Sequence, residues 1–357
     1  MDAGFTVFPV QPIQSKEYRR RVTPSGASDD QRAAWALALA LRMDGRQWRT
    51  LRPEDPLTLE LRLLCRDQVA LIEERTAKVN QLRAALREYY PAALEAFDDW
   101  TKPSAWDFVL TFPTPQALYL AGRRSQQRFL HTHHLGQAAA LARRLEVFSR
   151  AMQFQGTPPT TAAKSRSAVT LAKCLRTLEA QIRDYDQHIQ ALYAKHPDHD
   201  WFGSLPIAQD GRTAPRLLAE LGDDRGRFDS AQALQCQGGT APVTQRSGIL
   251  VCHKFRRACN KHLRYAMHWF ADLSRRTCTW AETYYQAKRQ AGMSHAAALR
   301  CLGQRWFKIL WKMWQTRKPY DPHLHMENQL RHGSWVLLAK NPSAAPIPAL
   351  NASQERA

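Results

Sequence analysis

The sequence predicts a mainly α-helical fold, and three observations support this expectation. Apolar residues recur at intervals of three and four over long stretches, as they do on the buried face of a helix. A strand is expected only at residues 5–10, where β-branched and aromatic residues gather. With 357 residues, 44% of them hydrophobic, the chain can bury a substantial core.

The first fifty residues combine the short strand with one helix. Residues 5–10 read Phe-Thr-Val-Phe-Pro-Val, and the strand is closed by Gln11 and Pro12. A helix rich in alanine and leucine is expected from about 29 to 43. A strand that opens a chain needs partner strands, and nothing upstream supplies them. We therefore expect residues 1–50 to form only part of an α/β domain.

Residues 51–195 predict central coiled-coil helices. A helix at 56–90 would form a rod of about 50 Å, at roughly 1.5 Å per residue. A second apolar seam follows at 171–192. The two seams could pack against each other, pack against a second subunit, or belong to an ordinary helical-bundle core. The first seam is Cys65, Ile72, Val79 and Leu86, and the second is Leu171, Leu175, Leu178, Ile182, Tyr185, Ile189 and Leu192.

Two breaks are predicted between these seams. Residues 112–115 read Phe-Pro-Thr-Pro and predict a turn, and helix is expected from there to about Met152. Residues 156–161 read Gly-Thr-Pro-Pro-Thr-Thr, a composition typical of a linker.

A C-terminal domain of shorter helices is predicted at residues 196–320. Gly222 and Ser230 are residue types that end and begin helices. Residues 321–357 are rich in proline and alanine, and we expect a disordered tail there. The helices of the domain are expected at 216–221, from 230 onward, at 259–275 and at 296–316.

Positive charge is concentrated in the last third of the chain. The whole chain has a net charge of +19 and a pI near 10.0. Between Gln245 and Lys318, sixteen lysines and arginines stand against two acidic residues, so this stretch holds fourteen of the nineteen net charges. Such an excess predicts a polyanionic partner, with a solvated basic face as the alternative. Nucleic acid is favoured over a membrane because no long apolar run or lipid-anchor motif is present.

The sequence also bears on the cellular compartment. No charged start followed by an apolar stretch opens the chain, so no secretory signal is expected. The seven cysteines are scattered, which favours reduced thiols. We therefore expect a cytoplasmic protein, located in the cytosol, or in the nucleoid if the host is bacterial.

One serine in the basic stretch has the surroundings of a phosphodiester nucleophile. Ser247 lies in the glycine-bounded segment 238–248, so we expect a reachable hydroxyl on a flexible loop. A plain turn is the alternative. Neighbouring cations could neutralise phosphate. The candidate nucleic-acid-binding residues are Arg246, Lys254, Arg256, Arg257, Asn260, Lys261 and Arg264.

Two other residue sets suggest functions that their spacing does not favour. One set of cysteines and histidines suggests a zinc site, but its spacings do not match those of standard zinc sites. The set is Cys252, His253, Cys259, His262 and His268. Aromatic residues at helical spacing could stack on bases, but core packing is the simpler interpretation. They are Trp280, Tyr284, Tyr285, Trp306, Trp311 and Trp314.

Short motifs occur in a characteristic order over about nine-tenths of the chain. They include Val-Phe-Pro-Val at 7–10, Tyr-Tyr-Pro at 89–91, Leu-Leu-Ala-Glu-Leu-Gly-Asp at 217–223, Gly-Gly-Thr-Ala-Pro-Val-Thr-Gln-Arg-Ser-Gly at 238–248 and Arg-Arg-Ala-Cys-Asn-Lys-His-Leu-Arg at 256–264. In these motifs the chain resembles the bacterial insertion-sequence transposases of the IS110/IS116 type.

This resemblance implies a DNA transposase with two catalytic parts that works as a multimer. One part would be an RNase H-like (RuvC-like) domain whose Asp-Glu-Asp-Asp set binds Mg²⁺. The other would be the C-terminal transposase domain, whose serine attacks DNA, and by motif this serine is Ser247. The implied partners are DNA, a guide ("bridge") RNA and further copies of the chain, which would associate through the coiled coil.

The chain departs from the family pattern in its acidic residues. The family reads Ser-Gly-Ala-Lys-Asp-Asp-Pro-x-Asp-Ala where residues 25–34 read Ser-Gly-Ala-Ser-Asp-Asp-Gln-Arg-Ala-Ala. Asp30 remains as the candidate catalytic and metal-binding acid, but Ala33 replaces the last one. The first two acids belong to strands that would precede Met1, so we expect an N-terminally truncated copy. One acid cannot assemble a two-metal site. A catalytically inactive nucleic-acid-binding derivative is therefore the alternative to an active transposase.

Overall fold

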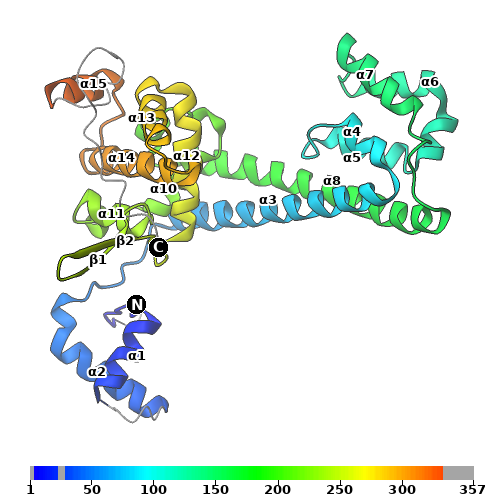
Figure 1. Cartoon of the computed structure of the whole chain (residues 1–357). Helices are drawn as coiled ribbons and strands as arrows, with labels where there is room; N and C mark the ends of the chain where they lie inside the picture. Colours follow the sequence, from blue (N-terminus) through cyan, green and yellow to red (C-terminus); the bar gives the residue numbers. More distant parts are fainter. Residues whose placement is uncertain (1–3, 23–28, 333–357) are drawn as a thin grey trace. The chain divides into compact units, whose positions relative to one another are not determined.

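The computed structural model describes residues 4–22 and 29–332, which are mainly helical as predicted (Figure 1). The chain divides into two compact units, residues 1–55 and residues 56–357. Within the described residues, β structure is limited to one two-stranded antiparallel sheet.

The first unit consists of two packed helices, α1 (Pro12–Val22) and α2 (Asp30–Asp44), followed by the short 3₁₀ helix η1 (Gly45–Gln47). Asp29 caps α2, since its side chain accepts a hydrogen bond from the Arg32 backbone N at 2.7 Å. The ring of Trp48 lies against the rings of Phe8 and Tyr18. The predicted helix at 29–43 is confirmed.

The predicted strand at residues 5–10 is wrong. These residues are extended, and Val7 O accepts a backbone hydrogen bond from Leu51 N at 2.7 Å. The described part of this unit offers no second strand, so a ladder of hydrogen bonds cannot form. The Ser-Gly-Ala motif at 25–27 lies outside the described residues.

In the second unit two long helices lie side by side as an arm. Helix α3 (Pro56–Tyr89) runs away from the C-terminal helices and α8 (Pro158–Lys195) returns to them (Figure 1). Halfway along, Arg75 of α3 and Glu179 of α8 form an ion pair at 2.6 Å with both side chains largely buried. Of the packing arrangements considered above, the seams therefore pack against each other within one chain. Buried apolar residues of these two helices include Leu61, Cys65, Val79, Leu82, Leu86, Leu175, Leu178, Ile182 and Ile189.

A small aromatic core closes the far end of the arm. Phe108 is buried at its centre and stacks on Phe148 with ring centroids 5.1 Å apart. The predicted turn is confirmed: Thr114 caps the following helix and Pro113 O accepts a hydrogen bond from Tyr89 Oη at 3.0 Å. The helices here are α4 (Pro91–Ala96), α5 (Pro103–Thr111), α6 (Pro115–Thr132) and α7 (Ala138–Ser149).

The predicted linker at 156–161 is instead the packed start of α8. Thr157 caps the helix, and Gly156 N donates to Tyr89 O at 3.3 Å. A Cβ atom at Gly156 would lie 2.8 Å from the carbonyl oxygen of Glu88. The glycine thus permits close contact between the end of α3 and the start of α8, and the two prolines occupy the first turn of a helix, where they are tolerated.

The near end of the arm belongs to a second, larger core. Leu61 and Ile189 of the arm are buried in it together with Phe270 and Trp306 of the C-terminal helices. The four helices predicted in this region are confirmed, and Ser230 and Gly222 sit at the expected helix ends. The elements are α9 (His199–Gly203), η2 (Ala208–Asp210), α10 (Thr213–Leu221), η3 (Arg225–Arg227), α11 (Ala231–Gln237), β1 (Val243–Ser247), β2 (Leu250–Lys254), α12 (Lys261–Thr277), α13 (Thr279–Gln290) and α14 (His295–Thr316).

A further helix, α15 (Pro322–Arg331), lies in the segment expected to be a disordered tail. Asp321 caps it by accepting hydrogen bonds from the backbone N atoms of His323 and Leu324. Its His325 ring lies 4.7 Å from the Trp280 ring, which ties the helix to the core. Residues 333–357 lie outside the described residues.

Candidate functional site

Ser247 is the last residue of β1, at the tip of a β-hairpin formed by residues 243–254, which we call the serine hairpin (Figure 1). Ser247 pairs with Leu250, so Gly248 and Ile249 form a two-residue turn. Gly248 has φ +57° and Ile249 does not have a positive φ, as in a type II′ turn. Ser247 is exposed, and among the described residues its hydroxyl has no hydrogen-bond partner. The nucleophile candidate is thus reachable, but it sits on a strand rather than on a loop.

The hairpin places Ser247 and Arg246 on opposite faces, because successive side chains of a strand point in opposite directions. Ser247 shares its face with Gln245 and with the cross-strand partners Leu250 and Cys252. The cation next to the serine in sequence is therefore not the one best placed to meet a phosphate at its hydroxyl.

The glycines before the hairpin pack tightly instead of providing flexibility. A Cβ atom at Gly238 would lie 2.4 Å from two ring carbons of Phe307. At Gly239, where φ is +66°, a Cβ would lie 2.6 Å from Cys259 Sγ. Arg256 holds the other side of the hairpin base, donating from Nε to Ala241 O at 3.0 Å. The base of the hairpin is fixed to the domain, while its tip projects into solvent.

The six basic residues among the candidate nucleic-acid-binding residues fall into two groups. Lys254, Arg257 and Lys261 are exposed together with Arg246. Arg256 and Arg264 are half-buried and hold backbone: Arg256 donates to the carbonyls before β1, and Arg264 donates to Arg256 O at 3.3 Å. The first group is therefore free to meet a phosphate, whereas the second also holds the backbone at the hairpin base.

Asn260 has a structural position that the sequence did not reveal. Its Oδ1 caps α12, and its Nδ2 donates to Glu220 Oε2 at 2.6 Å. Glu220, in α10, is buried and also accepts two hydrogen bonds from the Arg66 guanidinium of α3 at 2.7 and 2.9 Å. Burial alone would raise the pKa of Glu220, but these donors outweigh it and hold the pKa below its usual value. The signal available in the sequence was a lone acid among apolar residues at 217–221.

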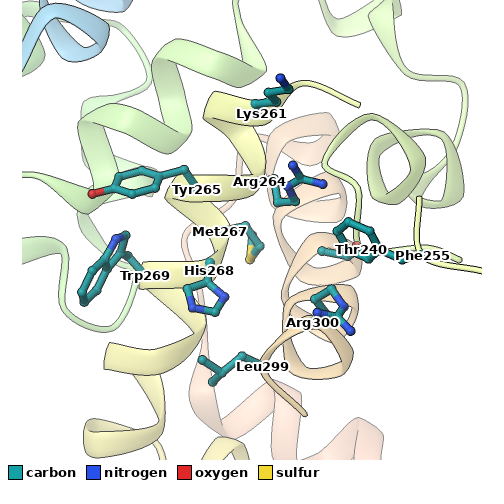
Figure 2. A pocket seen from close by; sticks show the side chains of 10 residues that line it. All are labelled: Thr240, Phe255, Lys261, Arg264, Tyr265, Met267, His268, Trp269, Leu299 and Arg300. Atoms are coloured by element: carbon teal, nitrogen blue, oxygen red, sulfur yellow. The ribbon is translucent and has the colours of Figure 1, made fainter. Parts of the chain in front are cut away.

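A pocket of about 560 Å³ opens beside the hairpin base, which we call the α12 pocket (Figure 2). Arg264 and Arg300 lie over the ring of Phe255, with guanidinium carbons 5.1 and 4.9 Å from its centroid. Burial lowers the pKa of His268 below 6.5, and the nearby His295 and Arg300 act in the same direction. The pocket is lined by Thr240, Phe255, Lys261, Arg264, Tyr265, Met267, His268, Trp269, Leu299 and Arg300.

The aromatic residues singled out in the sequence belong to the core, in line with the simpler interpretation. Trp306 is fully buried and donates to Ser274 Oγ at 2.9 Å, and Trp280 donates to Tyr320 Oη at 3.0 Å. Trp311, which is half-buried, donates to Phe228 O at 3.1 Å. The exposed aromatic rings near the basic residues are instead Phe255 and Trp269.

Asp30 is exposed at the first position of α2, in the other unit of the chain from Ser247. Within residues 4–22 and 29–332, no three histidine, cysteine, aspartate or glutamate side chains come together as a metal site. The described residues thus do not by themselves build the magnesium site that the resemblance implies.

Comparisons with known proteins identify the family. A family model described as "Transposase" matches residues 1–91, and one described as "Transposase IS116/IS110/IS902 family" matches residues 210–286. The chain is 31% identical over 325 residues to the "Mini-circle putative transposase for IS117" of Streptomyces coelicolor, which covers 88% of this chain and 77% of that protein. The chain belongs to the IS110/IS116 transposase family.

Two other relatives extend the match to this family. The "Insertion element IS110 uncharacterized 43.6 kDa protein" of Streptomyces coelicolor is 27% identical over 305 residues, covering 84% of this chain and 74% of the relative. The "Insertion element IS900 uncharacterized 42 kDa protein" of Mycobacterium paratuberculosis is 29% identical over 278 residues, covering 76% of this chain and 68% of the relative. Within this transposase, the segment matched at 210–286 contains the serine hairpin, Glu220 and α12. Among the described residues of the chain, no helix is both long enough and apolar enough to span a membrane.

Proposed function

We propose that this transposase cuts and rejoins DNA with the Ser247 hydroxyl as nucleophile. The observation that carries the proposal is the exposed, unpartnered hydroxyl at the tip of a hairpin whose base is fixed in a basic domain. In the proposed step the Ser247 Oγ–P bond forms and one P–O bond of the DNA backbone breaks. The serine proton passes to a water molecule, and the leaving oxygen takes a proton from solvent. The phosphodiester is conserved as a protein–DNA linkage, so a DNA hydroxyl can later reverse the step.

The charges around the hairpin support nucleic acid as the substrate. Lys254, Arg257 and Lys261 are exposed at the hairpin base and the start of α12, and no ion pair engages them in the described part of the chain. Cations in such positions bind phosphate and release counterions, so affinity should fall steeply with salt. A DNA backbone bound by these cations would lie about 14 Å from Ser247, because four strand residues at about 3.4 Å each separate the hairpin base from its tip.

A divalent metal and a guide RNA are part of the proposal through the family resemblance. Asp30 is the metal-ligand candidate of this chain, and because it stands alone among the described residues we derive no step through a metal. The concentrated basic charge is compatible with RNA as well as DNA. Self-association through the arm would use its outward faces, since the apolar seams of α3 and α8 cover each other.

The second candidate is a nucleic-acid-binding protein that performs no strand transfer. It is favoured by Ala33, which stands where the family pattern has an acid. Both candidates share the basic surface, so DNA binding alone does not distinguish them. Formation of a covalent linkage does.

The deciding experiment incubates the chain with labelled element-end DNA, guide RNA and Mg²⁺ and resolves the products on a denaturing gel. A retained protein–DNA band that is abolished in Ser247→Ala supports the nucleophile. The matched control is Ser167→Ala, which removes an exposed serine of α8 and should leave the band unchanged. A band that persists in Ser247→Ala removes Ser247 from the chemistry. Salt-sensitive binding without any band favours the second candidate.

A further inference from the structure

The α12 pocket has the size and shape of a ligand site. Its volume of about 560 Å³ lies within the range of roughly 300–1,000 Å³ that is typical of small-molecule clefts. Buried Met267 and Leu299 form an apolar floor, and half-exposed side chains surround it. It lies beside the serine hairpin because Phe255, one of its lining residues, directly follows β2.

Two chemically different ends make up this pocket. At one end Arg264 and Arg300 both lie over the Phe255 ring, so this end of the pocket carries two cations. At the other end are the rings of Tyr265 and Trp269, which meet edge to face with centroids 6.3 Å apart (Figure 2). The lining contains no acidic side chain. One end thus suits an anion and the other a flat apolar ring.

The position of these residues on α12 shows that they are not part of the core stripe. Leu263, Met267 and Phe270 form the buried face of the helix. Lys261, Arg264, Tyr265, His268 and Trp269 fall off that stripe at about 100° per residue. Trp269 remains 44% exposed, so a large apolar ring of the pocket is left in solvent.

We propose that the α12 pocket receives one unpaired nucleotide, with its base stacked on Trp269 and its phosphate bound by Arg264 and Arg300. Stacking on an aromatic ring next to cations is how proteins hold single-stranded nucleic acid without reading its sequence. A paired base cannot enter, because its faces are covered by its neighbours in the stack. This proposal rests on the proposed function, since it places the nucleotide on a nucleic-acid strand bound beside the serine hairpin.

The test compares duplexes that differ in one nucleotide. One is fully paired, and the other carries a central 2-aminopurine opposite an abasic site; both are made as DNA and as RNA. Fluorescence anisotropy gives Kd at fixed salt, and 2-aminopurine emission reports stacking. We expect tighter binding of the unpaired duplex by about five- to 150-fold, as one base–aromatic stack provides. The DNA and RNA arms show which strand the pocket holds.

Two variants and two controls make the outcome specific. Trp269→Ala should abolish the preference for the unpaired duplex and keep the affinity for the paired one. Arg300→Gln should weaken binding of the unpaired duplex and reduce the salt dependence of that binding. Tyr119→Ala, another exposed ring, and Lys308→Gln, an exposed cation on the outer side of α14, should leave the preference unchanged.

Equal affinity for paired and unpaired duplexes in both arms would overturn the proposal, and so would a preference that survives Trp269→Ala. Neither result affects the proposed function, which the Ser247-dependent adduct decides. Conversely, a Trp269-dependent preference in a chain that forms no adduct would support the pocket and count against the nucleophile.

Discussion

The side-chain amide of Asn260 donates to Glu220 over 2.6 Å while its Oδ1 caps the first turn of α12. Because Glu220 also accepts two hydrogen bonds from Arg66, one buried carboxylate joins the arm, α10 and the start of α12. The serine hairpin ends six residues before Asn260. The carboxylate therefore positions the helix that carries the α12 pocket.

Replacing this carboxylate should destabilise the domain. Glu220→Gln removes the negative charge that faces Arg66, and breaking a buried ion pair typically costs 3–5 kcal/mol; because Arg66 is 36% exposed, we expect about 2–3 kcal/mol. Urea unfolding followed by circular dichroism measures the loss. Glu74→Gln, an exposed glutamate of α3, is the control and should change stability by less than about 0.5 kcal/mol. Equal stability of the two variants would refute the role of Glu220.

Asn260 and Lys261 are neighbours with different expected roles. Asn260→Ala removes a helix cap and should lower the free energy of unfolding by about 1–2 kcal/mol, with little change in the salt dependence of DNA binding. Lys261→Gln should leave stability unchanged and reduce the slope of log K against log salt by about 0.9, because one fewer phosphate is neutralised. Paired unfolding and salt-titration measurements check both. The reverse pattern would make Asn260 the residue that binds nucleic acid.

The packing of Gly238 predicts a steric effect. Gly238→Ala places a methyl group 2.4 Å from ring carbons of Phe307, so we expect a destabilisation of about 1–3 kcal/mol, as overpacking usually costs. Gly203→Ala is the control, because a Cβ there meets nothing within 4 Å. Thermal unfolding compares the two. If Gly238→Ala were as stable as Gly203→Ala, the close approach of Gly238 to Phe307 would be absent.

Stability should depend on pH through His325. Burial against Trp280 and Tyr320 lowers the pKa of His325 below its usual 6.5. The unfolded chain then binds more protons than the folded one between the folded pKa and 6.5, so stability is full above pH 6.5 and falls as pH decreases through that window. His325→Phe should make this slope shallower in urea unfolding between about pH 5 and about pH 7.5, a range that brackets the usual histidine pKa. The slope that remains in His325→Phe should still show stability falling as pH decreases, because the pKa of His268 is lowered as well. An unchanged slope would contradict the burial of His325.

The long helices were predictable because their apolar spacing is a local property of the sequence. The seams of α3 and α8 and the stripes of α12 and α14 each predicted the correct helix. The bounds of α3, α12 and α14 differ by a few residues, whereas α8 begins at Pro158, well before the seam at 171–192. The linker at 156–161 was misjudged because proline and threonine also begin helices, and only the packing of Gly156 against α3 decides between the two.

The β elements and the pocket depended on information that local patterns lack. Residues 5–10 have strand propensity but find no partner among the described residues, whereas Ser247 lies in a strand that propensity did not reveal because both faces of the hairpin are largely exposed. Pairing also decides that Arg246 faces away from Ser247. The α12 pocket joins residues from four separate segments between 240 and 300, which no spacing rule brings together.

The most direct test of the central claim is to map the covalent linkage by mass spectrometry. The chain is incubated with element-end DNA, guide RNA and Mg²⁺, then digested with nuclease and protease, and the peptides are sequenced. We predict a nucleotide attached to the Ser247 side chain. A nucleotide on any other residue, with Ser247 unmodified, would contradict the claim that this hydroxyl attacks DNA.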